Sequence, residues 1–140
     1  MSAGSDLDDL DELVHEDLVE HAAVPPGTPP GRAGVKAMMG AYRSGMPDLE
    51  LSVVKYLEQG DLVCAVLKIT GTHTGTLLGI APTGKRIEID AVDVVRISDG
   101  RAAEHWGAGD DLGMLTQLGV ITPPADIPGQ HAPRSTVSTP

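Results

Sequence analysis

The chain has 140 residues, of which 41% are hydrophobic, and a net charge of −10 at pH 7. This length fits one domain, and the acidic balance argues against nucleic acid or an anionic membrane surface as a partner, because both attract cationic proteins. The sequence has no apolar stretch near the roughly 20 residues of a membrane-spanning helix, and we do not expect its N-terminal residues to form a signal peptide. Its single cysteine, Cys64, excludes an internal disulfide. We therefore expect a cytoplasmic globular protein.

The first third of the chain predicts two helices separated by a loop. Residues 1–5 are expected to be disordered, whereas residues 6–19 carry apolar side chains at helical spacing, with Ser5 as a candidate N-cap. The segment 24–34 holds four prolines and three glycines, which predicts a stiff loop. The second helix is expected over residues 35–43, where apolar residues again recur at helical spacing.

A run of strands follows the predicted helices. The expected strands are residues 49–57, 62–72, 85–97 and 101–107. A glycine-rich connection joins the second strand to the third, and a short helix around residues 112–118 comes last. The domain is expected to span residues 6–121, and the Pro-, Ser- and Thr-rich residues 122–140 to form a disordered tail. This order predicts an α+β fold in which helices pack on one side of a curved antiparallel sheet, leaving a mouth that can hold a small apolar ligand.

The most informative strand is the alternating segment 87–97, which places Asp93 on one face with five apolar residues. The following Ser98-Asp99-Gly100 predicts a three-residue hairpin loop with glycine in the left-handed conformation. In that register Asp93 lies opposite His105, so the two form a candidate catalytic pair for proton transfer on a sheltered face. A two-residue loop would instead shift the register and put them on opposite faces.

Further residues are candidates for contacts with a ligand. They are Tyr42, Met38, Met39, Ala91, Trp106, Asp110 and His21. The two methionines and the tyrosine either pack in the core or form a pliable pocket wall. Trp106 is out of phase with His105 and is expected to face the helices. Asp110 either caps the last helix or reaches the cavity mouth, and His21 either rims the pocket or is an exposed loop residue.

Several other kinds of site find no signature in the sequence. The histidines and the single cysteine do not follow a metal-binding spacing, and no metal or cofactor is expected. The glycines match neither a phosphate-binding loop nor a nucleophile elbow. His73, in the glycine-rich connection, is explained at least as well by a turn or a subunit contact as by catalysis.

Three segments carry a resemblance to a known family: GTHTGTLLGIAPTG (71–84), RISDGRAAEHW (96–106) and LGMLTQLG (112–119). The upstream segment DELVHEDLVEHAA, followed by PPG and GVKAMM, fits the same pattern. Over about residues 6–121 the chain resembles the SnoaL-like polyketide (ester) cyclases. The resemblance implies the cone of the nuclear-transport-factor-2-like fold and a homodimer. It also implies an intramolecular aldol ring closure by a carboxylate acting as general acid/base, without metal or organic cofactor.

The sequence departs from the pattern of that family at its key acid. In the founding cyclases the catalytic Asp lies two residues after the His that matches His105, where this chain has Gly107, and a His matches Asp93. The family's usual first helix, before Asp6, is also expected to be absent.

Two functions therefore remain open. One is a cofactor-free cyclase-like enzyme acting on a hydrophobic secondary-metabolite intermediate by ring closure, isomerisation or epoxide opening. The alternative is a non-catalytic binding or dimerisation module with a vestigial site.

Overall fold

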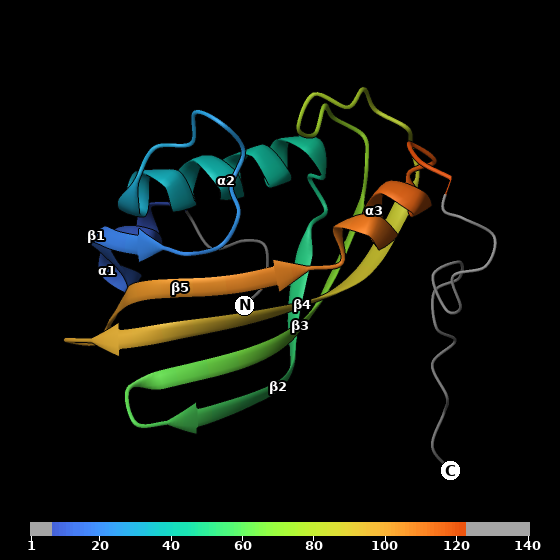
Figure 1. The fold of residues 1–140 in the computed structure, drawn as a ribbon. Helices are drawn as coiled ribbons and strands as arrows, with labels where there is room; N and C mark the ends of the chain where they lie inside the picture. Colours follow the sequence, from blue (N-terminus) through green and yellow to red (C-terminus); the bar gives the residue numbers. More distant parts are fainter. Residues whose placement is uncertain (1–6, 123–140) are drawn as a thin grey trace, which may run out of the picture.

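The computed structural model describes residues 7–122, which fold into a five-stranded sheet with helices on one side (Figure 1). The elements are a 3-10 turn η1 (Leu7–Asp9), α1 (Leu10–Leu13), β1 (Val14–Glu20), α2 (Gly31–Gly45), β2 (Glu50–Gln59), β3 (Leu62–Thr72), β4 (Arg86–Ser98), β5 (Arg101–Gly109) and α3 (Asp111–Gln117). The expected α+β class and the four predicted strands are confirmed. The expected disorder of residues 1–5 and of the tail 122–140, apart from Thr122 itself, falls outside the described residues and stays a prediction.

The sheet has the strand order β1-β5-β4-β3-β2. Neighbouring strands from β2 to β5 are antiparallel, whereas β1 lies parallel to β5, so the sheet is mixed rather than purely antiparallel as expected. Figure 1 shows the sheet curving, with α2 across one face and α3 against the end of β4. A cavity lies between α2 and the inner face of the sheet and is lined by residues of both.

The predicted first helix is wrong from Val14 onward, because residues 14–20 form β1. Val14 and Leu18 are buried and lie four residues apart, a spacing that places two residues on one side of a helix and also on one face of a strand. The free edge of β5 supplies backbone partners for this segment, with Glu20 beside His105. The tertiary pairing therefore overrides the local helical pattern, and α1 keeps only one turn.

Helix α2 begins at Gly31, four residues before the predicted start, and ends at Gly45. Gly31 and Gly34 lie in its first turn, where added Cβ atoms would collide with the backbone oxygens of Glu16 and Pro29. These glycines therefore let the helix approach β1 and the preceding loop closely. The same glycines made the segment resemble loop in the sequence.

The hydrophobic core lies where the glycine-rich connection, β4 and α3 meet. Its buried members are Met46, Leu49, Leu77, Ile87, Ile89, Met114 and Leu118. Leu77, from the glycine-rich connection, is fully buried against Gly45 at the end of α2. None of the helices within residues 7–122 is long and apolar enough to cross a membrane.

Candidate active site

The β4–β5 hairpin decides which side chains meet inside the cone. Its loop has two residues, Asp99 and Gly100, both with positive φ, rather than the predicted three. Such a loop alone would place Asp93 and His105 on opposite faces, but a bulge in β5 adds one residue and restores the phase. The predicted register is therefore wrong, since Asp93 pairs with Gly107, yet Asp93 and His105 still share a face.

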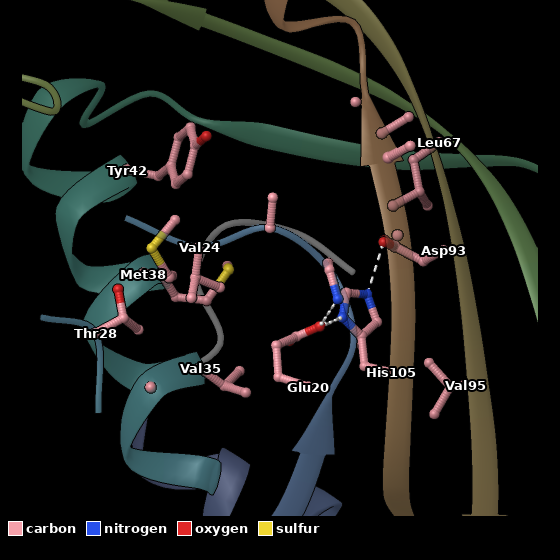
Figure 2. A pocket seen from close by; sticks show the side chains of 18 of the residues that line it. Glu20, Val24, Thr28, Val35, Met38, Tyr42, Leu67, Asp93, Val95 and His105 are labelled. Atoms are coloured by element: carbon pink, nitrogen blue, oxygen red, sulfur yellow. Dashed lines mark hydrogen bonds and ion pairs between the residues drawn. The ribbon is translucent and has the colours of Figure 1, made fainter. Parts of the chain in front are cut away.

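Three ionisable side chains converge on this face, as Figure 2 shows. His105 lies between two carboxylates: its Nε2 is 2.8 Å from Asp93 Oδ1, and its Nδ1 is 2.7 Å from Glu20 Oε1 and 2.9 Å from Oε2. All three are partly buried, with side-chain exposures of 25% for His105, 23% for Glu20 and 33% for Asp93. Carboxylates accept hydrogen bonds, so a ring that donates to both carries protons on both nitrogens.

The two carboxylates raise the pKa of His105 to about 9. The hydrogen bond to Asp93 is the largest cause, Glu20 acts in the same direction, and burial of the ring opposes them. His105 is therefore an imidazolium at neutral pH. It acts as a fixed positive charge and hydrogen-bond donor, and has no lone pair with which to accept a proton.

This raised pKa predicts a loss of stability in alkaline solution. The folded pKa lies above the unfolded value of about 6.5, so the contribution of His105 is fully present below pH 6.5 and is lost as the pH rises through about 9. Between these values we expect the free energy of unfolding to fall by about 1–3 kcal/mol more in the wild-type protein than in His105→Gln. Urea denaturation at stepped pH measures both, and parallel pH curves would contradict the prediction.

The three ionisable side chains line a cavity of about 1020 Å³ between the sheet and α2. Among the residues expected to contact a ligand, Tyr42, Met38, Met39 and Ala91 line this cavity. Its other apolar walls come from all five strands, the loop before α2, and α3. They include Val14, Leu18, Val24, Val35, Leu51, Leu67, Ile69, Ile89, Val95 and Met114. In Figure 2, His105 faces the α2 side chains across the cavity.

Trp106, His21 and Asp110 do not line the cavity, so their expected ligand contacts are not supported. Trp106 alternates with His105 and points to the other face of β5, where its ring stacks on His21 at 4.7 Å rather than facing the helices. His21 also pairs with Glu104 at 2.8 Å, which holds it outside the cavity. Asp110 caps α3 by accepting a hydrogen bond from the Gly113 backbone N–H at 2.9 Å.

A second polar group lies on the α2 side of the cavity. Tyr42 is half-buried, and this burial, with a smaller contribution from the negative charge of Asp111, raises the pKa of its hydroxyl. The hydroxyl is therefore a neutral hydrogen-bond donor at physiological pH. Asp111 lines the cavity, whereas its neighbour Asp110, the cap of α3, does not.

Sequence reasoning missed Glu20, because it follows a segment that was predicted to be helical. The available signal was weak, consisting of buried-type residues at Val14 and Leu18 with Glu20 in the same two-residue phase. His73 is fully buried beside Thr83, outside the cavity. Within residues 7–122, no group of three or more His, Cys, Asp or Glu side chains is arranged to hold a metal ion.

The fold and this site define a cone-shaped α+β protein with a carboxylate–imidazolium cluster at the wall of an apolar cavity. The profile of the SnoaL-like polyketide cyclases matches residues 3–118, and the chain belongs to that family. It is 34% identical over 113 residues to nogalonic acid methyl ester cyclase of Streptomyces nogalater, an alignment covering 80% of this chain and 84% of that one. It is 31% identical over 116 residues to aklanonic acid methyl ester cyclase DnrD of Streptomyces peucetius, covering 80% and 79%.

Solved structures agree with this assignment. TsrD from Streptomyces laurentii superposes with a TM-score of 0.75 at 30% identity, covering 83% of this chain and 84% of that chain. Wild-type IdmH from Streptomyces antibioticus superposes with a TM-score of 0.71 at 36% identity, covering 81% and 87%. The likeness therefore extends over most of the chain in both sequence and fold.

Where the family resemblance places a catalytic Asp, this chain has Gly107, and the carboxyl group of Asp93 lies close to that position. Gly107 lies opposite Asp93 in the sheet, and a Cβ added at Gly107 would lie 2.5 Å from Asp93 Oδ1 and 2.9 Å from His105 Nε2. The Asp93 carboxyl thus lies next to the space that a side chain at 107 would enter. The chain presents a carboxylate to His105 from β4, beside the position at which the resemblance placed the family's acid on β5.

Proposed function

We propose that this protein is a polyketide-cyclase-like enzyme that acts on a hydrophobic secondary-metabolite intermediate, with Asp93 and His105 as catalytic residues. The observation that carries the proposal is the 2.8 Å hydrogen bond between these two side chains at the wall of a largely apolar cavity. Relatives named as methyl ester cyclases support the reaction class. The open cavity and the converging charges favour this function over a vestigial binding or dimerisation module, which would need neither.

In the proposed aldol closure, Asp93 accepts a proton from a substrate carbon next to a carbonyl group. The electron pair of that C–H bond forms an enolate, whose carbon attacks a second carbonyl carbon and makes the new ring bond. The π electrons of that carbonyl move to its oxygen, which takes the proton back from Asp93. The fixed positive charge of His105 stabilises the negative charge on the oxygen atoms during these steps. Protons and electrons balance, so the product is an isomer of the substrate.

The cavity contributes by holding the reacting ends together. A flexible chain loses entropy when it folds, and an apolar wall that binds it folded removes this cost from the chemical step. The methionines of α2 adapt to irregular shapes, and the Tyr42 hydroxyl can orient a polar group of the substrate. We assign Met38, Met39, Tyr42 and Ala91 to substrate binding in this proposal.

Incubation with nogalonic or aklanonic acid methyl ester, the compounds named in the relatives, tests the reaction. We expect a product of unchanged mass with a new retention time and absorption spectrum, formed faster than with heat-denatured protein. Liquid chromatography with mass detection and NMR of the product distinguishes ring closure from a double-bond shift. Epoxide opening of a suitable substrate would add one water. Saturable binding of either ester without turnover would support the binding-module alternative instead.

The proposal includes the homodimer that the family resemblance implies. Leu57 and Val92 point away from the cavity and are 64% and 42% exposed, so the outer face of the sheet offers apolar area for a second copy. Sedimentation equilibrium at micromolar concentration measures the subunit number, and a monomer would contradict this part. The expected cytoplasmic location stays a prediction.

A further inference from the structure

We propose that Glu20 is a positioning residue for the Asp93–His105 pair. By accepting hydrogen bonds from Nδ1 of His105, Glu20 holds the ring in its doubly protonated form and leaves Asp93 as the group that accepts the substrate proton. This inference rests on the proposed function and extends it to a residue on another strand.

Glu20 is itself held in place by a backbone hydrogen bond. Its Oε1 accepts a hydrogen bond from the Ala22 backbone N–H at 2.8 Å as well as from His105. The intervening backbone is tied to β5, because the His21 N–H donates to the His105 carbonyl oxygen at 2.9 Å. The end of β1 and the ring of His105 therefore form one hydrogen-bonded unit, in which the carboxylate has a fixed direction.

The two carboxylates that contact His105 differ in how many hydrogen bonds they accept. Both oxygens of Glu20 lie within hydrogen-bond distance of the ring, and one of them also accepts from the backbone. Asp93 uses only Oδ1, and its Oδ2 has no hydrogen-bond partner within the part of the chain that the structure describes. Asp93 therefore has one oxygen free to accept a substrate proton, whereas both oxygens of Glu20 already accept hydrogen bonds.

The charge of Glu20 also bears on the state of the His105 ring during the reaction. The ionisable groups that line the cavity with His105 are Glu20 from β1, Asp93 from β4, Tyr42 from α2 and Asp111 from α3. No lysine or arginine within residues 7–122 lines it. When Asp93 takes up the substrate proton it becomes neutral and no longer supports a charged ring. Glu20 then remains as the carboxylate in contact with the imidazolium, which keeps the positive charge in place while the enolate forms.

The test is Glu20→Gln, which keeps the shape and removes the charge. Titration of the His105 ring by NMR, assigned by comparison with His105→Gln, is expected to show a pKa at least about one unit lower than in the wild-type protein. With an ester substrate, we expect kcat to fall about 10–100-fold with KM changed less than about threefold, because the charge acts on the transition state. The alkaline limb of the rate profile is expected to move to lower pH with the ring.

Two variants make the result specific. Glu16→Gln makes the same chemical change on an exposed residue of the same strand and is expected to behave as wild type. Glu20→Asp keeps the charge and is expected to retain more of the raised His105 pKa than Glu20→Gln; it also serves if Glu20→Gln does not fold.

An unchanged His105 titration in Glu20→Gln would overturn the proposal, as would a shifted titration with an unchanged kcat and pH profile. The titration needs no substrate, so it measures the effect of Glu20 on the pKa of the His105 ring whether or not turnover is found. Absence of turnover by the wild-type protein counts against the proposed function alone.

Discussion

Replacement of Asp93 by Asn is expected to lower kcat for ring closure by at least about 100-fold, the usual lower range for loss of a general acid/base. The amide has nearly the same shape as the carboxyl group but cannot accept a proton at neutral pH. It also removes one of the two negative charges that keep His105 protonated. Initial rates of product formation under saturating substrate give kcat directly, and the His105 ring titration in the same variant reports the second effect.

A matched control separates chemistry from folding. Asp90→Asn makes the same change on the same strand, but Asp90 is 63% exposed and faces the other side of the sheet, where it pairs with Lys68 at 2.8 Å. Surface ion pairs contribute little to stability, so kcat and the unfolding midpoint are expected to stay near wild type. A wild-type kcat in Asp93→Asn, with intact folding, would refute Asp93 as the proton-accepting group.

Gly107→Ala is expected to cost about as much activity, although it adds only one methyl group. The new Cβ would lie 2.5 Å from Asp93 Oδ1 and 2.9 Å from His105 Nε2, so at least one of these side chains has to move. A displacement of about 1 Å in a catalytic group can reduce the rate about 100-fold. We therefore expect kcat to fall by that order, with the His105 titration shifted toward its ordinary pKa because the Asp93 contact is lost.

Gly109→Ala is the control for this change, since it adds the same methyl group to β5 at the cavity wall. Its nearest neighbours would lie 3.7 and 3.9 Å away, which is ordinary van der Waals contact. This variant is expected to keep at least about half of the wild-type kcat and a similar unfolding midpoint, as substitutions outside strained or buried contacts do. Equal activity in the two alanine variants would show that Gly107 is not needed to make room for the Asp93–His105 contact.

The contact of Asp93 with His105 thus depends on the absence of a side chain at Gly107. The carboxyl group reaches His105 from β4 only because the facing position on β5 has no side chain. Read from the family resemblance alone, Gly107 indicates a lost acid. In the fold it makes room for an acid on the neighbouring strand, and this exchange supports the enzyme reading over the vestigial one.

The sequence predicted the pairing of Asp93 with His105 for a reason that partly failed. Alternation along β4 correctly put Asp93 on the inner face, because residues two apart in a strand share a face. Ser98-Asp99-Gly100 predicts a three-residue loop, but the loop has two residues, and a bulge in β5 compensates for the difference. Loop length and bulges depend on the twist and pairing of the two strands, which a local reading of the turn does not contain.

The residues within each segment are enough to predict the strands β2 to β5, the apolar stripe of α2 and the inward phase of Asp93 in β4. These features are written in neighbouring residues, through the strand period of two and the helix period of 3.6. Contacts between distant segments, by contrast, make residues 14–20 a strand, bring Glu20 to His105 across 85 positions, and let Gly107 accommodate Asp93. β1 pairs with β5, a strand from a distant part of the chain. The periodicity within residues 14–20 does not contain the information that β5 has a free edge to pair with.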